Sequence, residues 1–116
     1  DFWRADSGML AALFALAELS GSDKSLSELL LPYNRYVLSG EINTRVSDTA
    51  ASLDLIRETF KADHELDELD GVTVTAKDYW FNVRPSNTEP LLRLNVEAVD
   101  EPTMKKVRDK VLKLIG

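Results

Sequence analysis

The stretch Tyr79–Val99, YWFNVRPSNTEPLLRLNVEAV, contains two runs of alternating character on either side of a polar segment. Successive side chains of a strand point to opposite faces, so the alternation predicts strands over residues 79–84 and 91–99. The polar segment RPSNTEP, residues 84–90, is short enough to join them as neighbouring antiparallel strands. This pair of strands decides the fold.

The elements around this pair predict an α+β domain. In chain order we expect a strand at 35–46, a helix from Ser47 or Asp48 to about 62, and an acidic loop at 63–71. A strand at 72–76 and the two strands above follow. A last helix is capped by Asp100 and has Pro102 in its first turn. The apolar stripe of that last helix comprises Met104, Val107, Val111 and Leu114. The predicted fold is a small antiparallel sheet of about four strands with two helices on one face, in the order β-α-β-β-β-α.

The first 31 residues have a different character. The segment MLAALFALAEL, residues 9–19, is apolar almost all round, which is typical of a helix buried on several sides in a larger body. Ser25 and Glu28 form a capping-box pattern that opens a second helix, and Pro32 stops it. We therefore divide the chain into residues 1–31, helices left over from an α/β domain, and residues 32–116, the domain described above.

Composition excludes several classes of function. The chain has 116 residues, about one domain, and its net charge of −6 disfavours nucleic acids and anionic membrane surfaces as partners. No run approaches the roughly 20 apolar residues of a membrane span. Cysteine is absent, which removes disulfide and thiolate chemistry and favours a reducing compartment, so we expect a cytoplasmic protein.

The polar segment between the two strands has the residues of an anion site. If Phe81 and Val83 face the helices, Arg84 and Arg93 emerge together on the uncovered face. The loop adds further donors, from Ser86, Asn87 and Thr88. Such donors beside a guanidinium suit a phosphate, and we expect Glu89 to turn back onto one of the two arginines. A plain polar turn is the alternative, because Pro, Ser and Asn are ordinary turn residues.

The same segment resembles a known family. Residues 84–94, RPSNTEPLLRL, together with Glu97, resemble the phosphate-binding loop of the α-D-phosphohexomutases. The Asn at position 87 makes this loop most similar to that of the phosphomannomutase/phosphoglucomutase branch. Residues 4–19, RADSGMLAALFALAEL, resemble the last long helix of that family's third domain. Residues 36–46, YVLSGEINTRV, resemble the first strand of its fourth, C-terminal domain. The resemblance covers essentially the whole chain.

The resemblance implies an enzyme of four domains, an isomerase acting as an intramolecular phosphotransferase. Such a mutase interconverts hexose 1-phosphates and 6-phosphates of mannose or glucose through a phosphoserine and a hexose bisphosphate. Its second domain binds magnesium, and its fourth domain grips the phosphate that is not reacting. Carried over by position, the substrate-phosphate ligands of this chain are Arg84, Ser86, Asn87 and Thr88, with Arg93 as a secondary candidate.

The remaining parts of such an active site have no counterpart in the sequence. No serine stands in the family's Ser-His-Asn-Pro setting, no Asp-Gly-Asp-x-Asp metal loop occurs, and His64 is the only histidine. We expect no catalytic or metal-binding residue here, no activity of the chain alone, and a phosphosugar and the parent's other domains as partners. Residues 39–43 and Trp80 are expected to be structural. A stand-alone anion-binding or regulatory module without a catalytic parent is the alternative.

Overall fold

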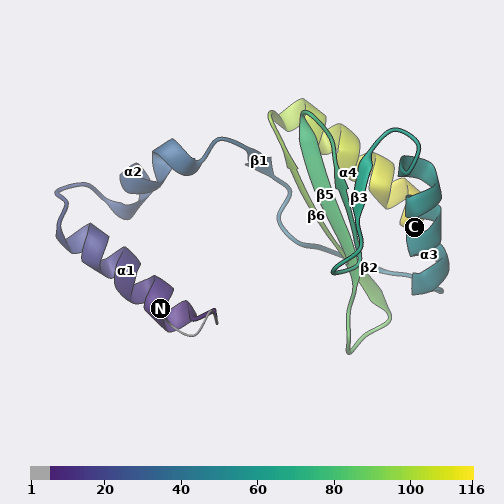
Figure 1. Ribbon diagram of the computed structural model, residues 1–116, viewed down its shortest axis with the longest axis horizontal. Helices are drawn as coiled ribbons and strands as arrows, with labels where there is room; N and C mark the ends of the chain where they lie inside the picture. The colour runs from purple at the N-terminus through teal and green to yellow at the C-terminus, as the bar shows by residue number, and fades with distance from the viewer. Residues whose placement is uncertain (1–5) are drawn as a thin grey trace. The chain divides into compact units, whose positions relative to one another are not determined.

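The computed structural model describes residues 6–116, and the chain divides into two compact units, Asp1–Arg35 and Tyr36–Gly116. The helical elements are α1 (Gly8–Ser20), α2 (Leu26–Leu30), a 3₁₀ turn (Leu31–Tyr33), α3 (Thr49–Phe60) and α4 (Glu101–Ile115). The strands are β1 (Val37–Leu38), β2 (Ile42–Arg45), β3 (Glu65–Asp67), β4 (Val72–Thr75), β5 (Tyr79–Pro85) and β6 (Leu91–Ala98) (Figure 1). None of the helices within residues 6–116 has the length and apolar character that crossing a membrane requires.

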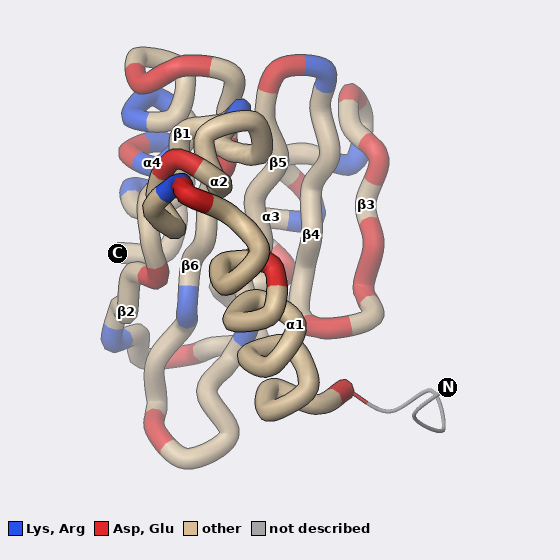
Figure 2. Tube along the Cα trace, turned by 90° about the vertical axis from the view of Figure 1, so that its left-hand side faces the viewer, with Lys and Arg blue, Asp and Glu red and all other residues tan. Residues whose placement is uncertain are grey.

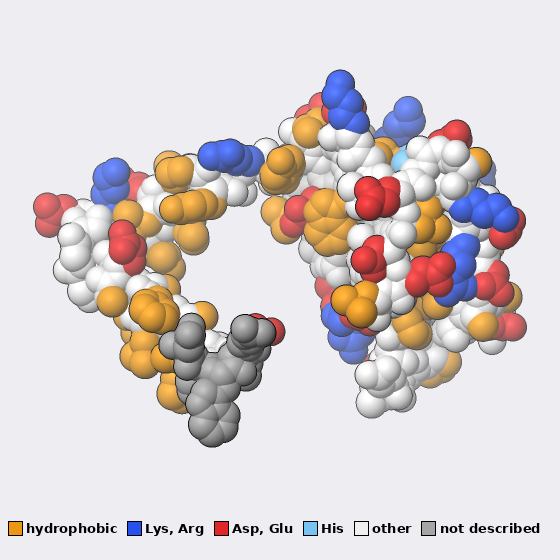
Figure 3. All heavy atoms as spheres, in the orientation of Figure 1, with side chains coloured by type: hydrophobic (Ala, Val, Ile, Leu, Met, Phe, Trp, Pro, Cys, Tyr) orange, Lys and Arg blue, Asp and Glu red, His pale blue; other side chains and the backbone are white. Residues whose placement is uncertain are grey.

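The first unit contains two capped helices. Ser7 caps α1, its hydroxyl accepting from the Leu10 N–H at 3.3 Å, and Ser25 and Glu28 form the predicted capping box of α2. Helix α1 has no buried residue within the described chain, and Phe14 is 73% exposed. Figure 3 shows its hydrophobic side chains at the surface. The assignment of these helices to a preceding α/β domain stays a prediction.

The second unit is a six-stranded antiparallel sheet in the order β1-β6-β5-β4-β3, with β2 also paired to β6 (Figure 2). Helices α3 and α4 contact each other and pack on one face of the sheet (Figure 1). The predicted α+β class and the two helices on one face are therefore confirmed. The predicted count of about four strands is wrong.

Two segments account for the additional strands. Gly40, at φ 69°, interrupts the strand expected over 35–46, so that β1 and β2 pair with different parts of β6. The segment expected to be an acidic loop contains β3, which pairs with β4 along the sheet edge. Only Leu66 of β3 turns inward, so main-chain hydrogen bonds rather than apolar side chains define this strand.

The core lies between the two helices and the sheet. Its fully buried large side chains are Phe60, Phe81, Ile56, Leu92, Leu94, Val72, Val74, Val83, Val96 and Val111. The alternation read from the sequence therefore holds along β5 and β6, except that Leu91 is also buried. In α4 the fourth buried residue is Ile115, whereas Leu114 is only partly buried against the core.

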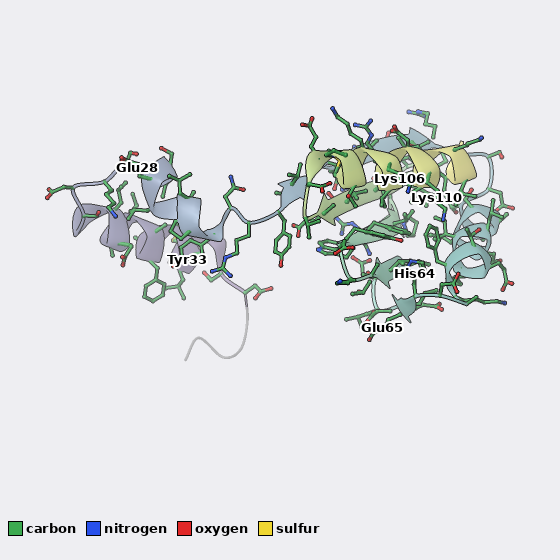
Figure 4. The ribbon with its side chains drawn as sticks, turned by 90° about the horizontal axis from the view of Figure 1, so that it is seen from above. Glu28, Tyr33, His64, Glu65, Lys106 and Lys110 are labelled. Atoms are coloured by element: carbon green, nitrogen blue, oxygen red, sulfur yellow. The ribbon has the colours of Figure 1, made fainter. Side chains whose placement is uncertain are left out.

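An aromatic cluster closes the core beside α3. Phe60 packs edge-on against Phe81 and His64, with ring centroids 5.0 and 5.3 Å apart. Nζ of Lys110 lies 4.3 Å from the centroid of the Phe60 ring. Figure 4 labels His64 and Lys110. Nε2 of His64 lies 2.8 Å from the Tyr79 hydroxyl, and burial raises the pKa of that hydroxyl. His64 thus has a structural environment on the side of the sheet that the helices cover.

Candidate functional site

The register of β5 and β6 brings two arginines together. Arg84 and Arg93 are directly paired positions on the two strands. Their neighbours Val83 and Leu94 are fully buried, so the arginines point to the opposite face of the sheet, where their side chains are 38% and 36% exposed. As the alternation predicts, two cations share one uncovered surface.

The loop that joins the two strands is held by its own hydrogen bonds. Ser86 N–H donates to the Leu91 carbonyl at 2.9 Å, and Leu91 N–H donates to the Glu89 carbonyl at 2.8 Å. The Ser86 hydroxyl accepts from Thr88 N–H at 3.4 Å and lies 3.5 Å from the Thr88 hydroxyl. Within residues 6–116, the N–H groups of Asn87 and Glu89 donate to no protein acceptor. The loop is therefore ordered by its own contacts and still offers donors.

A hollow of about 260 Å³ lies between the loop and the two arginines. Its lining residues are Arg84, Pro85, Ser86, Asn87, Thr88 and Arg93. All five residues named from the sequence thus border one hollow, with two guanidiniums, two hydroxyls and an amide. This chemistry suits an anion that has several oxygens.

Two carboxylates from distant parts of the chain contact the arginines. Arg84 lies 3.5 Å from Glu41 (Nη2 to Oε2) and 3.3 Å from Asp70 (Nη1 to Oδ2). Arg93 lies 3.6 Å from Glu41 (Nη1 to Oε1), and its Nε is buried with no partner within the described residues. Neither carboxylate is predicted from the sequence to lie at the site, and the segment that contains Glu41 is expected to be structural. No local pattern reveals them, because they lie in the segments just before β2 and β4 and reach the site only when the sheet is assembled.

The expected contact of Glu89 is wrong. Its Oε1 lies 3.7 Å from Nη2 of Arg45, and both side chains are largely exposed. The physical reason is the pairing of Arg45 with Leu91, which puts Arg45 beside the end of the loop. Glu89 is thereby engaged outside the hollow.

The surface beyond the arginines is polar and aromatic. Trp80 is half-buried on the sheet, as expected for a structural aromatic residue, and its Nε1 donates to Oε2 of Glu97 at 2.9 Å. A second hollow, of about 450 Å³, borders Trp80 and shares Arg84 with the first. Across residues 6–116, no three His, Asp or Glu side chains gather where they could hold a metal ion. The arrangement can bind an anion, and the described residues offer no metal site beside it.

Comparison with known proteins identifies the family. Residues 41–114 match the family model described as "Phosphoglucomutase/phosphomannomutase, C-terminal domain". The chain is 49% identical over 111 residues to a phosphomannomutase of Methanocaldococcus jannaschii and 33% identical over 114 residues to one of Escherichia coli K12. These alignments cover 96% and 97% of this chain.

A crystal structure of a phosphoglucomutase/phosphomannomutase family protein from Burkholderia thailandensis has the same fold. Its TM-score is 0.71 at 24% identity, over 97% of this chain and 24% of that one. The chain likewise spans about a quarter of the length of the curated relatives, 24% and 25% of the two named above. By the family model and these identities, the chain belongs to the phosphoglucomutase/phosphomannomutase family and contains its C-terminal domain.

Proposed function

We propose that this chain is the substrate-phosphate clamp of a hexose-phosphate mutase. In this proposal Arg84, Ser86, Asn87 and Thr88 bind the phosphate that is not transferred, and Arg93 supports them from the adjacent strand. The parent interconverts 1- and 6-phosphates of mannose or glucose through a phosphoserine and a hexose bisphosphate. The observation that carries the proposal is the single hollow bordered by these five residues, in a chain whose relatives are named phosphomannomutases.

The chemistry of the site supports binding rather than transfer. Guanidiniums and hydroxyls hold phosphate oxygens through charge-assisted hydrogen bonds, and positioning is a large part of catalysis in phosphoryl transfer. The hydroxyls of Ser86 and Thr88 lie beside each other, while the only histidine contacts Tyr79. In our proposal the phosphoserine, the magnesium ion and the groups that hold the sugar belong to other domains of a cytoplasmic parent.

Titration of the full chain with glucose 1-phosphate tests this proposal. We expect a dissociation constant roughly in the millimolar range, because one clamp supplies few of the parent's contacts. The backbone amide resonances of Ser86 to Glu89 should shift most. Replacing Arg84→Ala should weaken binding at least about tenfold, since a hydrogen bond to a charged group contributes about 1.5–3 kcal/mol.

The matched control is Arg108→Ala. Arg108 carries the same charge but lies on α4, where its Nε contacts Asp109 at 2.8 Å. This replacement should leave the dissociation constant within about twofold of the unmodified chain, because it removes the same long-range charge without touching the hollow. Shifts centred on α4, or equal losses in the two variants, would place the anion elsewhere.

A further inference from the structure

The carboxylate of Glu41 contacts both Arg84 and Arg93, as a bound anion would. One oxygen lies 3.5 Å from Arg84 and the other 3.6 Å from Arg93, so a single carboxylate spans both guanidiniums. Glu41 directly precedes β2, whose first pair with β6 is Ile42 with Leu94. The pairing of β2 with β6 therefore places this carboxylate at the site, although it belongs to a separate segment of the chain.

The two contacts are weak enough to exchange. Charge-assisted hydrogen bonds between nitrogen and oxygen measure about 2.7–2.9 Å, and both contacts of Glu41 are longer. The carboxylate is 37% exposed, and ion pairs open to water contribute little. Glu41 also leaves Nε of Arg93 buried without an acceptor among the described residues. A phosphate, with three free oxygens, could take that donor as well.

The charges at the site favour one class of anion. Two cations, Arg84 and Arg93, face two carboxylates, Glu41 and Asp70, so the empty site is close to neutral. A monoanion that replaces the Glu41 carboxylate exchanges one negative charge for another. A dianion that replaces it adds attraction to both guanidiniums. Displacing Glu41 costs every anion the same free energy, so an anion must bind the two guanidiniums strongly to occupy the site, and a dianion does so better than a monoanion.

We propose that Glu41 is an internal competitor of the substrate phosphate and sets the affinity of the site for anions. It holds the arginine pair while the site is empty, and a dianionic phosphate monoester displaces it, whereas monoanions compete poorly. The inference rests on the proposed function, in which Arg84 and Arg93 face the phosphate. Glu41 acts here as a residue that limits the affinity of the site, and no chemical step is assigned to it.

The test compares Glu41→Gln with Glu89→Gln in the full chain. Both variants remove one negative charge near the loop and keep the side-chain length, but Glu89 contacts Arg45 instead of the two site arginines. Glucose 1-phosphate at pH 8 supplies the dianion, because phosphate monoesters have a second pKa near 6. Acetate supplies the monoanion. Amide shifts of residues 86–89 report both titrations at constant ionic strength.

We expect Glu41→Gln to bind glucose 1-phosphate roughly three- to tenfold more tightly, the range that two exposed ion pairs allow. Acetate should gain by a similar factor, because displacing Glu41 costs both ligands the same free energy. Glu89→Gln should change both constants by less than about twofold. A gain for both ligands separates competition from a merely structural role, in which both ligands would bind more weakly.

Three outcomes would overturn the inference and leave the proposed function intact: unchanged affinity in Glu41→Gln, weaker binding in it, or an equal gain in Glu89→Gln. The proposed function itself fails by a different result. It fails when the unmodified chain does not bind glucose 1-phosphate at residues 86–89, or when Arg84→Ala binds it as well. The two proposals are therefore tested by separate variants.

Discussion

Gly71 packs directly against the backbone of Arg84. A Cβ placed on Gly71 would lie 2.7 Å from Cα of Arg84 and 2.2 Å from the carbonyl oxygen of Val83. Gly71 also has φ +73°, a conformation that side chains other than glycine rarely adopt. The turn before β4 thus packs against the backbone of Arg84, the principal arginine of the site. This close packing requires glycine at position 71.

Gly71→Ala should therefore destabilise the domain and disturb the site together. The clash and the positive φ should lower the free energy of unfolding by at least about 2 kcal/mol, measured by urea denaturation. Gly40→Ala is the control, because Gly40 has φ +69° but nothing within 4 Å of its added Cβ. Gly40→Ala should lower the free energy of unfolding by only about 1 kcal/mol, from backbone strain alone. Equal losses in the two variants would contradict the close packing under Arg84.

The two units should respond differently to the loss of an aromatic ring. Phe81 is fully buried, and Phe81→Ala should cost about 3–5 kcal/mol, enough to unfold a marginally stable domain. Phe14 is 73% exposed in α1, so Phe14→Ala should change unfolding by less than about 0.5 kcal/mol. Thermal unfolding followed by circular dichroism measures both. A comparable loss in Phe14→Ala would show that α1 buries this ring in solution.

Acid should weaken the start of α4. The side chain and the backbone N–H of Thr103 hydrogen-bond to Asp100 and lower the pKa of that carboxyl. Because the pKa is lower in the folded state, the stabilisation is present above the unfolded value, near 4, and is lost as pH falls through the folded value. Asn also caps helices but does not titrate, so Asp100→Asn should lose less thermal stability between pH 6 and pH 2.

The control for that comparison is Asp63→Asn, on the exposed surface between α3 and β3. Its acid sensitivity should match that of the unmodified chain. If Asp100→Asn also matched the unmodified chain, the cap would contribute nothing to acid unfolding.

The chain alone should show no mutase turnover. In our proposal the phosphoserine and the magnesium loop belong to other domains, and one clamp cannot supply the positioning that phosphoryl transfer requires. A coupled assay from mannose 1-phosphate to the 6-phosphate, with magnesium and hexose bisphosphate added, measures this. Turnover that remains with the chain through purification, and that disappears in Arg84→Ala, would contradict the prediction.

Local patterns predicted the elements that carry the site. Alternation along 79–99 located β5 and β6, and their pairing followed from a short loop, so the facing arginines could be expected. Strand β3 could not be found this way, because its polar residues pair through main-chain atoms and only Leu66 contributes to the core. Glu41 was missed for a related reason. Its two partners lie 43 and 52 positions away (84 − 41 and 93 − 41), and only the completed sheet brings them together.

The second unit should fold and bind without the first. Every residue of the described buried core lies between Leu53 and Ile115, and all six residues around the hollow lie within that span. A chain of residues 36–116 should therefore keep the amide spectrum of the sheet and the same millimolar affinity for glucose 1-phosphate, because it keeps every residue of the described core. Its urea midpoint should lie close to that of the full chain. An unfolded 36–116 chain, or one that folds but no longer binds, would show that residues 1–35 contribute to the domain.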